Sequence, residues 1–211
     1  MPNTLQSPPQ QVQNGVSDDL LITAHAAMLA GRHFNQQASN LAKQGYMGAY
    51  PSSLGQEACQ VAAALALEPA DWLFPTYRDS VAVMSRGIDL AEVLSPFHGS
   101  SHCGYAPTKT HTAPEATPLA THTAHAVGLA MAAKFAGDST VALAMCGDGS
   151  TSEGDFHEAL NLAAVFEAPV VFLVQNNGYA ISTPVSRQMR AASIAAKGEG
   201  YGMPAYRVDG N

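Results

Sequence analysis

Two apolar runs with a helical pattern between them are the strongest signal in the sequence. The runs cover residues 141–145 and 170–174, and each is followed by a short polar turn. Between them, a segment at about 153–167 carries Phe156 and Leu160 four positions apart, the spacing of one helical face. The order is therefore strand, turn, helix, strand, turn. This order predicts an α/β fold in which parallel strands end at one edge of a sheet, where such folds bind ligands.

The rest of the chain predicts further helices around this centre. Ser17 followed by two aspartates is typical of a helix start, because a serine side chain accepts from free backbone N–H groups and acids suit the positive helix end. We expect a disordered arm over 1–16, rich in Gln, Pro and Asn, and one domain over 17–211. The expected elements are helices at about 17–43, 55–67 and 121–136, a short helix beginning near Asp89, and a third strand at 206–208.

The two turns suggest the ligand. Gly147-Asp148-Gly149 follows the first apolar run, and Asn176-Asn177-Gly178-Tyr179 follows the second. Glycines let backbone amides approach a phosphate, but the carboxylate of Asp148 would repel it unless a cation lay between them. Mg²⁺ is commonly held by a carboxylate or two together with phosphate oxygens. Asp148, the amide oxygen of Asn177 and the carbonyl of Tyr179 are therefore candidate Mg²⁺ ligands beside a diphosphate.

Two alternatives remain open on the residues alone. The first is a dinucleotide site, since Gly147-x-Gly149-x-x-Ser152 is one residue short of that fingerprint. The fingerprint also expects an acid at the end of the second strand, where this chain has Gln175 followed by two asparagines. The second alternative is an ordinary pair of polar turns with no ligand.

Composition excludes several classes of protein. The 211 residues carry a net charge of −7, from 10 basic and 17 acidic residues, without a basic cluster, so nucleic acid is not an expected partner. No run of 18 apolar residues predicts a membrane span, and the N-terminus lacks a signal-peptide pattern. Three cysteines without a C-x-x-C pair favour a reducing, cytoplasmic location. They are Cys59, Cys103 and Cys146.

Two other segments contain residues that could bind a phosphate or a metal ion. Tyr77-Arg78 offers a guanidinium whose planar donors suit phosphate oxygens, although alone such a pair is more often a surface or capping feature. The irregular segment 98–116 contains three histidines and a cysteine. Their spacing fits no established zinc pattern, so a loop over the mouth of the site is the preferred interpretation.

With these residues in view, the chain resembles a known family. Asp148 and Asn177 lie 29 positions apart, in a Gly-Asp-Gly to Asn-Asn pattern similar to the thiamine diphosphate motif. The stretches SEGDFHEALN and NNGYAISTP resemble the alpha subunit of the first component of 2-oxo acid dehydrogenase complexes, of the pyruvate and branched-chain types. The resemblance covers about residues 41–211.

The resemblance implies a thiamine diphosphate-binding fold, with a doubly wound, mostly parallel sheet and helices on both faces. It implies thiamine diphosphate and Mg²⁺ as cofactors. Leu119 would be the apolar wedge that keeps thiamine bent, and backbone groups near Thr117 and Leu119 would bond the pyrimidine. No potassium ion is expected, because Ala116 and His122 stand at two ligand positions. The implied cofactor-binding residues are Tyr77, Arg78, Thr117, Leu119, Gly147, Asp148, Gly149, Ser150 and Asn177.

The resemblance also implies partners. A beta subunit, in an alpha2-beta2 assembly, would supply the glutamate that activates thiamine, so we name no catalytic residue in this chain. A lipoyl acyltransferase would receive the acyl group from a small 2-oxo acid. The sequence stops within a family motif at Asn211, which indicates a C-terminally truncated chain. We expect no decarboxylation by the chain alone. The alternative is a non-catalytic fragment that keeps a cofactor half-site or a subunit-binding surface.

Overall fold

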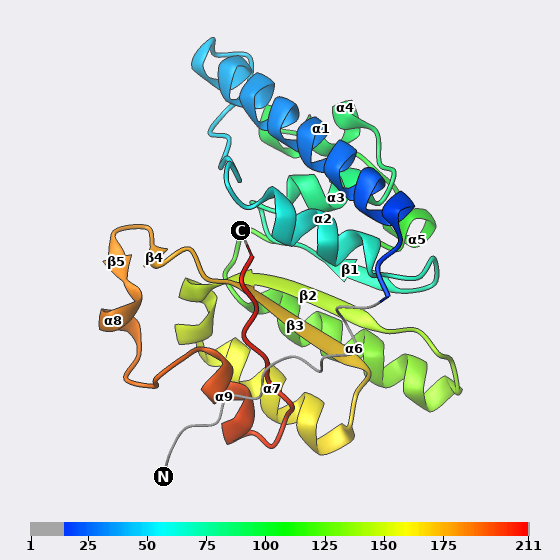
Figure 1. Ribbon diagram of the computed structural model, residues 1–211, viewed down its shortest axis with the longest axis vertical. Coiled ribbons are helices and arrows are strands. Elements are labelled where there is room, and N and C mark those ends of the chain that lie inside the picture. The colour runs from blue at the N-terminus through cyan, green and yellow to red at the C-terminus, as the bar shows by residue number, and fades with distance from the viewer. Residues whose placement is uncertain (1–14, 211) are drawn as a thin grey trace.

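A parallel sheet lies between two groups of helices in the computed structural model, which describes residues 15–210 (Figure 1). In the described residues the sheet has three strands in the order β1-β2-β3, with bounds Trp72–Phe74, Ala142–Gly147 and Val170–Gln175. Both pairings are parallel, and Gly147 is the register partner of Gln175. The predicted α/β class with a parallel sheet is therefore confirmed.

Helices cover both faces of the sheet (Figure 1). One face carries α1 (Asp18–Lys43), α2 (Glu57–Leu65) and α3 (Ser80–Ser85), and the other carries α6 (Thr121–Ala136) and α7 (Gly154–Phe166). None of the helices in residues 15–210 is long and apolar enough to cross a lipid bilayer. The shorter elements are α4 (Leu90–Leu94), η2 (Ser95–His98), α5 (Pro107–Thr110), η3 (Asp148–Ser152), β4 (Tyr179–Ala180), β5 (Thr183–Pro184), α8 (Val185–Gln188) and α9 (Ala195–Gly200).

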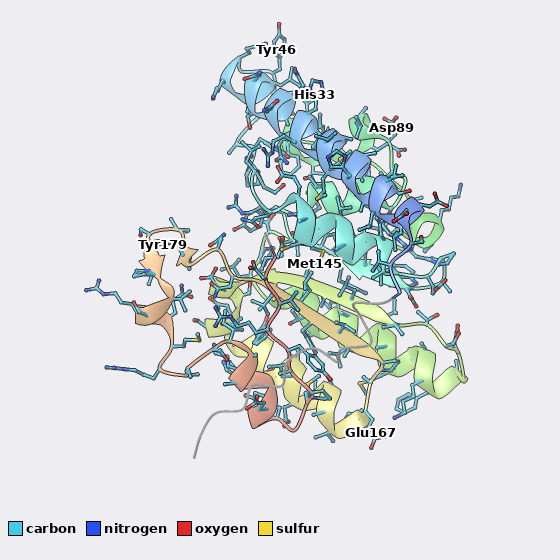
Figure 2. All side chains as sticks on the ribbon, in the orientation of Figure 1. His33, Tyr46, Asp89, Met145, Glu167 and Tyr179 are labelled. Carbon is cyan, nitrogen blue, oxygen red and sulfur yellow. The ribbon has the colours of Figure 1, made fainter. Side chains whose placement is uncertain are left out.

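The alternation of side chains along the strands builds two cores. Leu73 and Met145 face the α1–α3 side, where they pack with Phe34 of α1, and Figure 2 labels Met145 between the sheet and α2. Phe74 and Ala144 face the other side, where small residues of α6 pack against them. Alanines on both surfaces let α6 approach the sheet closely. The strand ends that carry the site are thus fixed between two packed helical layers.

Most predicted elements are confirmed. The long first helix begins after Ser17, whose Oγ accepts from the Leu20 amide at 3.2 Å. The helix at 121–136 has the predicted bounds, and those at 153–167 and 55–67 are each slightly shorter than predicted. The short helix α4 begins at Asp89, whose Oδ1 accepts from Ala91. Most of the predicted arm, residues 1–14, lies outside the described residues.

The predicted third strand at 206–208 is wrong. The structure assigns that segment no strand, and Tyr206 and Val208 are 47% and 72% exposed. The third strand is β1, whose Leu73 is fully buried and pairs with Leu143 of β2. A three-residue strand followed by Pro75 has too few residues to show a periodicity, which is why the pattern did not reveal it.

Candidate functional site

The two predicted turns lie against each other at the carboxyl edge of the sheet. Gly147 and Gln175 end neighbouring strands in register, and the chain continues from them into η3 and into the β4–β5 hairpin. A Cβ added to Gly149 would lie 2.7 Å from the Cβ of Ala180, closer than side chains normally approach. Glycine at 149 therefore permits η3 and the hairpin to touch at Ala180, three positions after Asn177.

Asp148 lies at the centre of this contact. It is only 2% exposed, and its Oδ2 accepts a 3.1 Å hydrogen bond from Nε2 of Gln188, in α8. Ser150, two positions on, has a buried Oγ without a hydrogen-bond partner among the described residues. Buried polar atoms are almost always paired in proteins, so an unpaired hydroxyl beside a buried carboxylate fits a bound polar group.

Lys197 of α9 bonds to the same segment through Thr151 of η3. Its ammonium donates to the carbonyl oxygen and, at 2.9 Å, to the hydroxyl of Thr151. Burial lowers the pKa of Lys197. The Thr151 hydroxyl in turn donates to the backbone carbonyl of Asp148 at 2.8 Å. These bonds link α9 to η3.

Asn177 and Tyr179, the other predicted metal ligands, lie on the exposed loop that follows β3. The Oδ1 of Asn177 accepts from the backbone N–H of Tyr179 at 3.1 Å, and Asn176 makes the same kind of bond to Gly178. Asparagines commonly stabilise turns in this way. Figure 2 shows Tyr179 on the hairpin, away from the sheet. Asn177 is thus near η3 in the fold, and its side chain supports the turn.

Tyr77 and Arg78 follow β1 and lie at the same edge of the sheet. The guanidinium of Arg78 lies 5.6 Å from the centre of the Tyr77 ring, and its Nη1 donates to the carbonyl of Ser52 at 2.7 Å. A guanidinium has five N–H donors. In the described residues one nitrogen is engaged by this bond, so donors remain to bind an anion.

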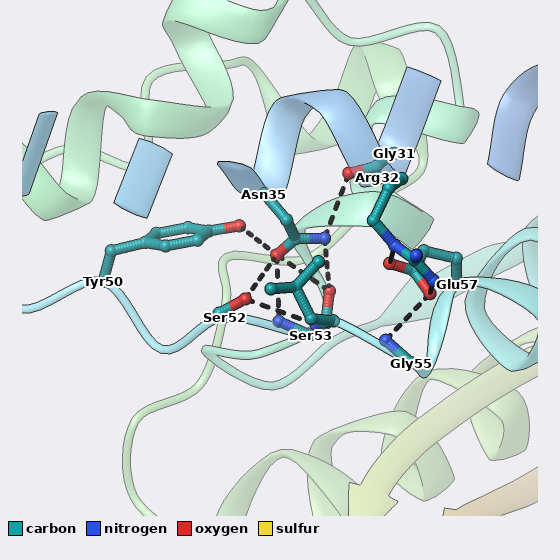
Figure 3. Close-up of polar contacts among 9 residues, drawn as sticks. Gly31, Arg32, Asn35, Tyr50, Ser52, Ser53, Gly55 and Glu57 are labelled. Atoms are coloured by element: carbon teal, nitrogen blue, oxygen red, sulfur yellow. Dashed lines mark hydrogen bonds and ion pairs between the residues drawn. The ribbon is translucent and has the colours of Figure 1, made fainter. Parts of the chain in front are cut away.

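The loop that contacts Arg78 is held by a buried asparagine of α1. Asn35 Oδ1 accepts from the Tyr50 hydroxyl at 3.0 Å and from the Ser53 N–H at 2.9 Å, while its Nδ2 donates to Gly31 and Ser53 (Figure 3). A second link is the ion pair of Arg32 with Glu57, at 2.6 Å. The position of Arg78 therefore depends on a fixed loop.

Asp79 joins the strand ends beneath the surface. Its Oδ1 accepts from Gln175 at 2.6 Å and from Gln60 at 3.2 Å, and its Oδ2 accepts from the N–H and the hydroxyl of Thr76. Burial raises the pKa of Asp79, against the effect of these donors and of His122. No sequence pattern predicts this network, because Gln175 and Asp79 are 96 positions apart.

The segment before α6 is tied to the same place. Backbone bonds join Ala116 to Tyr77 and Pro75, at 3.1 and 3.0 Å. Glu115 accepts from Ser80 through Oε1 at 2.9 Å, whereas its Oε2 is buried and unpaired in the described residues. Burial raises the pKa of Glu115 to about 8, and the negative charge of Asp79 acts in the same direction.

Thr117 and Leu119 therefore lie beside the Tyr77-Arg78 turn. Both are exposed, with Leu119 at 39%, and Ala120 behind them is fully buried with a positive φ of 63°. An exposed leucine on a fixed turn is compatible with the predicted role as an apolar wedge. The Nε2–H of His122 donates to the Met145 carbonyl at 2.6 Å, and burial lowers the pKa of His122.

The histidines of segment 98–116 do not converge. His98 Nδ1 lies 2.8 Å from the Tyr46 carbonyl, whereas His111 contacts the Pro69 carbonyl and stacks on Trp72. Among residues 15–210, no three His, Cys, Asp or Glu side chains form a group that could hold a metal ion. The predicted magnesium ligands are a different set, consisting of one carboxylate, one amide and one carbonyl.

The residues at this edge fit a metal-bound diphosphate. A buried carboxylate, an unpaired buried hydroxyl and a guanidinium with remaining donors all belong to segments that the fold brings to one edge. The carboxylate would suit a cation, and the guanidinium would suit an anion. The hydroxyl could bond to either a donor or an acceptor of the ligand. The structure gives no acid at the end of β3 that would hold a dinucleotide ribose, since Gln175 there is bonded to Asp79.

Comparison with known proteins identifies relatives over nearly the whole chain. The chain is 48% identical over 194 residues to 3-methyl-2-oxobutanoate dehydrogenase subunit alpha of Mycobacterium tuberculosis, covering 92% of this chain and 53% of the relative. It is 38% identical to the mitochondrial 2-oxoisovalerate dehydrogenase subunit alpha 2 of Arabidopsis thaliana, covering 93% and 43%. It is 35% identical to the pyruvate dehydrogenase E1 component subunit alpha of Acholeplasma laidlawii, covering 96% and 59%.

The chain spans about half the length of these relatives. The family model described as dehydrogenase E1 component matches residues 25–211, which include every candidate site residue. The names of these relatives agree with the family resemblance that the sequence motifs indicated. This chain belongs to the dehydrogenase E1 component family.

Proposed function

We propose that the chain is the diphosphate-holding part of the alpha subunit of a thiamine diphosphate-dependent 2-oxo acid dehydrogenase. The observation that carries this proposal is the contact of the two strand-end turns around buried Asp148, through Gly149 and Ala180, in a member of the E1 component family. The proposed domain, 17–211, has the thiamine diphosphate-binding fold. A cytoplasmic location remains a prediction from the cysteine pattern.

Each part of the site has a distinct task in this proposal. Arg78 and Tyr77 bind the diphosphate, and the amides of Gly147, Gly149 and Ser150 approach its oxygens. Asp148, Asn177 and the Tyr179 carbonyl hold Mg²⁺. Thiamine diphosphate, when bound, supplies the electron sink for loss of carbon dioxide from a 2-oxo acid. These side chains would hold and orient the cofactor, and Leu119 with the Thr117 backbone would support its thiamine part.

In this proposal, partner proteins supply the group that activates thiamine and the acceptor of the acyl group. The proposed beta subunit, in an alpha2-beta2 assembly, carries the glutamate that activates thiamine, and the proposed lipoyl acyltransferase accepts the acyl group. Exposed apolar side chains on α6 and α7 support subunit contact, because such patches commonly mark interfaces. They are Phe135, Leu162, Val165 and Phe166.

A branched-chain 2-oxo acid is the favoured substrate class over pyruvate. The support is the 48% identity to a relative named for 3-methyl-2-oxobutanoate, against 35% for one named for pyruvate. The second candidate function is a non-catalytic fragment with a cofactor half-site or subunit-binding surface. Its support is the exposed apolar side chains of α6 and α7, such as Phe135 and Val165, which would suit a subunit-binding surface with or without catalysis.

The deciding assay measures carbon dioxide release from 3-methyl-2-oxobutanoate and from pyruvate, with thiamine diphosphate and Mg²⁺ supplied. We expect turnover only when a cognate beta subunit is added, with a higher kcat/KM for the branched-chain acid. No turnover in the mixed sample, despite complex formation, would favour the non-catalytic fragment. Steady turnover by the chain alone would contradict the assignment of the activating glutamate to the partner.

A further inference from the structure

The side chain of Gln188 connects three parts of the metal edge. Its Nε2 donates to Oδ2 of Asp148 at 3.1 Å and to the carbonyl of Thr183 at 2.9 Å. Its Oε1 lies 3.5 Å from the hydroxyl of Ser152, within the accepted limit for a hydrogen bond. One amide from α8 therefore spans η3, which carries Asp148, and the hairpin that follows Asn177.

This bond leaves Asp148 able to bind a cation. An ionised carboxylate can accept at about four lone-pair positions on two oxygens. In residues 15–210 the structure gives its carboxylate one side-chain donor, that of Gln188. An N–H donated to one oxygen fixes the orientation of the carboxylate and does not compete for the other. Partners that orient a metal-binding carboxylate in this way typically contribute about 10–100-fold to metal affinity.

The hairpin has few other attachments. Ile181 at its tip is fully exposed with a positive φ of 56°, and the contact of Ala180 with Gly149 is van der Waals only. The Gln188 amide is thus a polar link through which a change at Asp148 can reach the hairpin and α8. A cation that draws the carboxylate into a fixed position would also fix the residue bonded to it.

We propose that Gln188 is a positioning residue for the metal-binding carboxylate of Asp148, and that it couples cation binding to the order of residues 179–190. This inference rests on the proposed function, since it takes Asp148 to be a metal ligand. The amide acts through Asp148 and does not touch the cation. Its two donors hold the carboxylate on one side and the Thr183 carbonyl on the other.

The test uses Mn²⁺ as a paramagnetic substitute for Mg²⁺ in the chain assembled with its beta subunit and saturated with thiamine diphosphate. Electron paramagnetic resonance of free Mn²⁺ gives the Kd for the cation. Gln188→Met keeps the length of the side chain and removes both donors, and should raise the Kd about 10–100-fold. Gln36→Met, an exposed glutamine on α1, is the matched control and should not change it.

A second variant separates positioning from direct coordination. Gln188→Glu places a carboxylate where the donor was, so a positioning role predicts weaker Mn²⁺ binding than in the wild type. Tighter binding by this variant would mean that residue 188 reaches the cation, which overturns the proposed role. An unchanged Kd for Gln188→Met would overturn it as well. The Kd of thiamine diphosphate at saturating Mn²⁺ should stay within about two-fold, because its diphosphate contacts lie mainly at Arg78.

Trypsin cleavage tests the coupling through a readout that does not depend on the measured Kd. Arg187 and Arg190 flank Gln188 and are exposed. Mn²⁺ should slow cleavage after both residues in the wild type and have no such effect in Gln188→Met. Cleavage that is indifferent to Mn²⁺ in the wild type, with Mn²⁺ shown to bind, would overturn the coupling. Absence of any Mn²⁺ or cofactor binding by the wild-type assembly would instead overturn the proposed function.

Discussion

The two sides of the proposed site are built differently. On the diphosphate side, Arg78 lies on a turn fixed by the buried side chains of Asp79 and Asn35, each of which makes several hydrogen bonds. On the metal side, Asp148 is buried, but Asn177 lies on the exposed loop after β3 and Tyr179 is exposed in the hairpin. One side is organised by the packed core and the other by a few surface contacts.

This difference indicates how the site would respond to a ligand. Segments with few buried contacts open at a lower free energy than the core, whereas buried polar networks keep one arrangement. We therefore expect the diphosphate side to be preorganised and the metal side to gain order when a cation binds. Changes on the first side should alter the free energy of unfolding, and changes on the second should alter affinity.

The largest effect is expected from removing the buried carboxylate of the metal side. Asp148→Ala should weaken Mg²⁺-dependent binding of thiamine diphosphate by at least ~100-fold, because even an outer partner of a ligand contributes about 10–100-fold. Isothermal calorimetry on the chain assembled with its beta subunit measures this. Glu199→Ala, an exposed acid on α9, is the control. Equal affinities of Asp148→Ala and the wild type would remove Asp148 from the metal site.

The diphosphate side should be sensitive to loss of its buried asparagine. Asn35→Ala leaves the Ser53 N–H and the Tyr50 hydroxyl without this acceptor, and should lower the free energy of unfolding by about 2–4 kcal/mol. Urea unfolding of the full chain measures it. Asn40→Ala, exposed on the same helix, should change stability by no more than about 0.5 kcal/mol. Similar losses in both variants would show that the network does not stabilise the loop.

The buried acids should make stability depend on pH. Burial raises the pKa of Glu115 to about 8 from an ordinary value of 4.5, and burial also raises that of Asp79. The folded chain then binds more protons than the unfolded chain, so the free energy of unfolding falls as pH rises towards 8. One group contributes at most about 1.4 kcal/mol per pH unit.

The range from pH 6.5 to 8 isolates this effect. Below 6.5 the lowered pKa of His122 acts in the opposite direction, because the unfolded chain then binds the extra proton. Glu115→Gln should flatten the fall in unfolding free energy over this range, while Glu92→Gln, an exposed acid of α4, should leave it intact. An unchanged slope in Glu115→Gln would show that Glu115 ionises normally in the folded chain.

A smaller effect is expected where η3 meets the hairpin. Gly149→Ala places a methyl group 2.7 Å from the Cβ of Ala180, so the hairpin must shift. Overpacking costs about 1–3 kcal/mol, and an exposed hairpin should yield at the lower end, which corresponds to about five-fold weaker cofactor binding. The double variant Gly149→Ala with Ala180→Gly should recover most of the affinity. No recovery would place the effect at the phosphate instead of the hairpin.

The sequence predicted the parts of the site that local patterns encode. Continuous apolar runs and the Gly147-Asp148-Gly149 turn identified β2, α7 and β3 in order. The ligand-binding edge that the motif indicates stays a prediction. The pairing of Gln175 with Asp79 could not be predicted, because it depends on side chains brought together by tertiary packing. The bond between Gln188 and Asp148 could not be predicted for the same reason, because no local pattern connects the two residues.

Strand prediction failed where packing decided the outcome. Residues 206–208 have an apolar pattern but pair with no strand in the described chain, whereas Trp72–Phe74 forms β1 because Leu73 and Phe74 face opposite cores. Three residues give no periodicity from which to infer this. Which segments join the sheet therefore depends on tertiary contacts, which the hydrophobic pattern of the sequence does not reveal.

Metal-dependent cofactor binding is the decisive test of a metal–diphosphate site at Asp148. Thiamine diphosphate is titrated by calorimetry into the chain assembled with its beta subunit, first with Mg²⁺, then with a chelator, and NAD is titrated in parallel. We expect saturable binding of thiamine diphosphate that requires Mg²⁺, and no response to NAD. Binding of NAD, or binding of thiamine diphosphate that is indifferent to the metal, would contradict a metal–diphosphate site at Asp148.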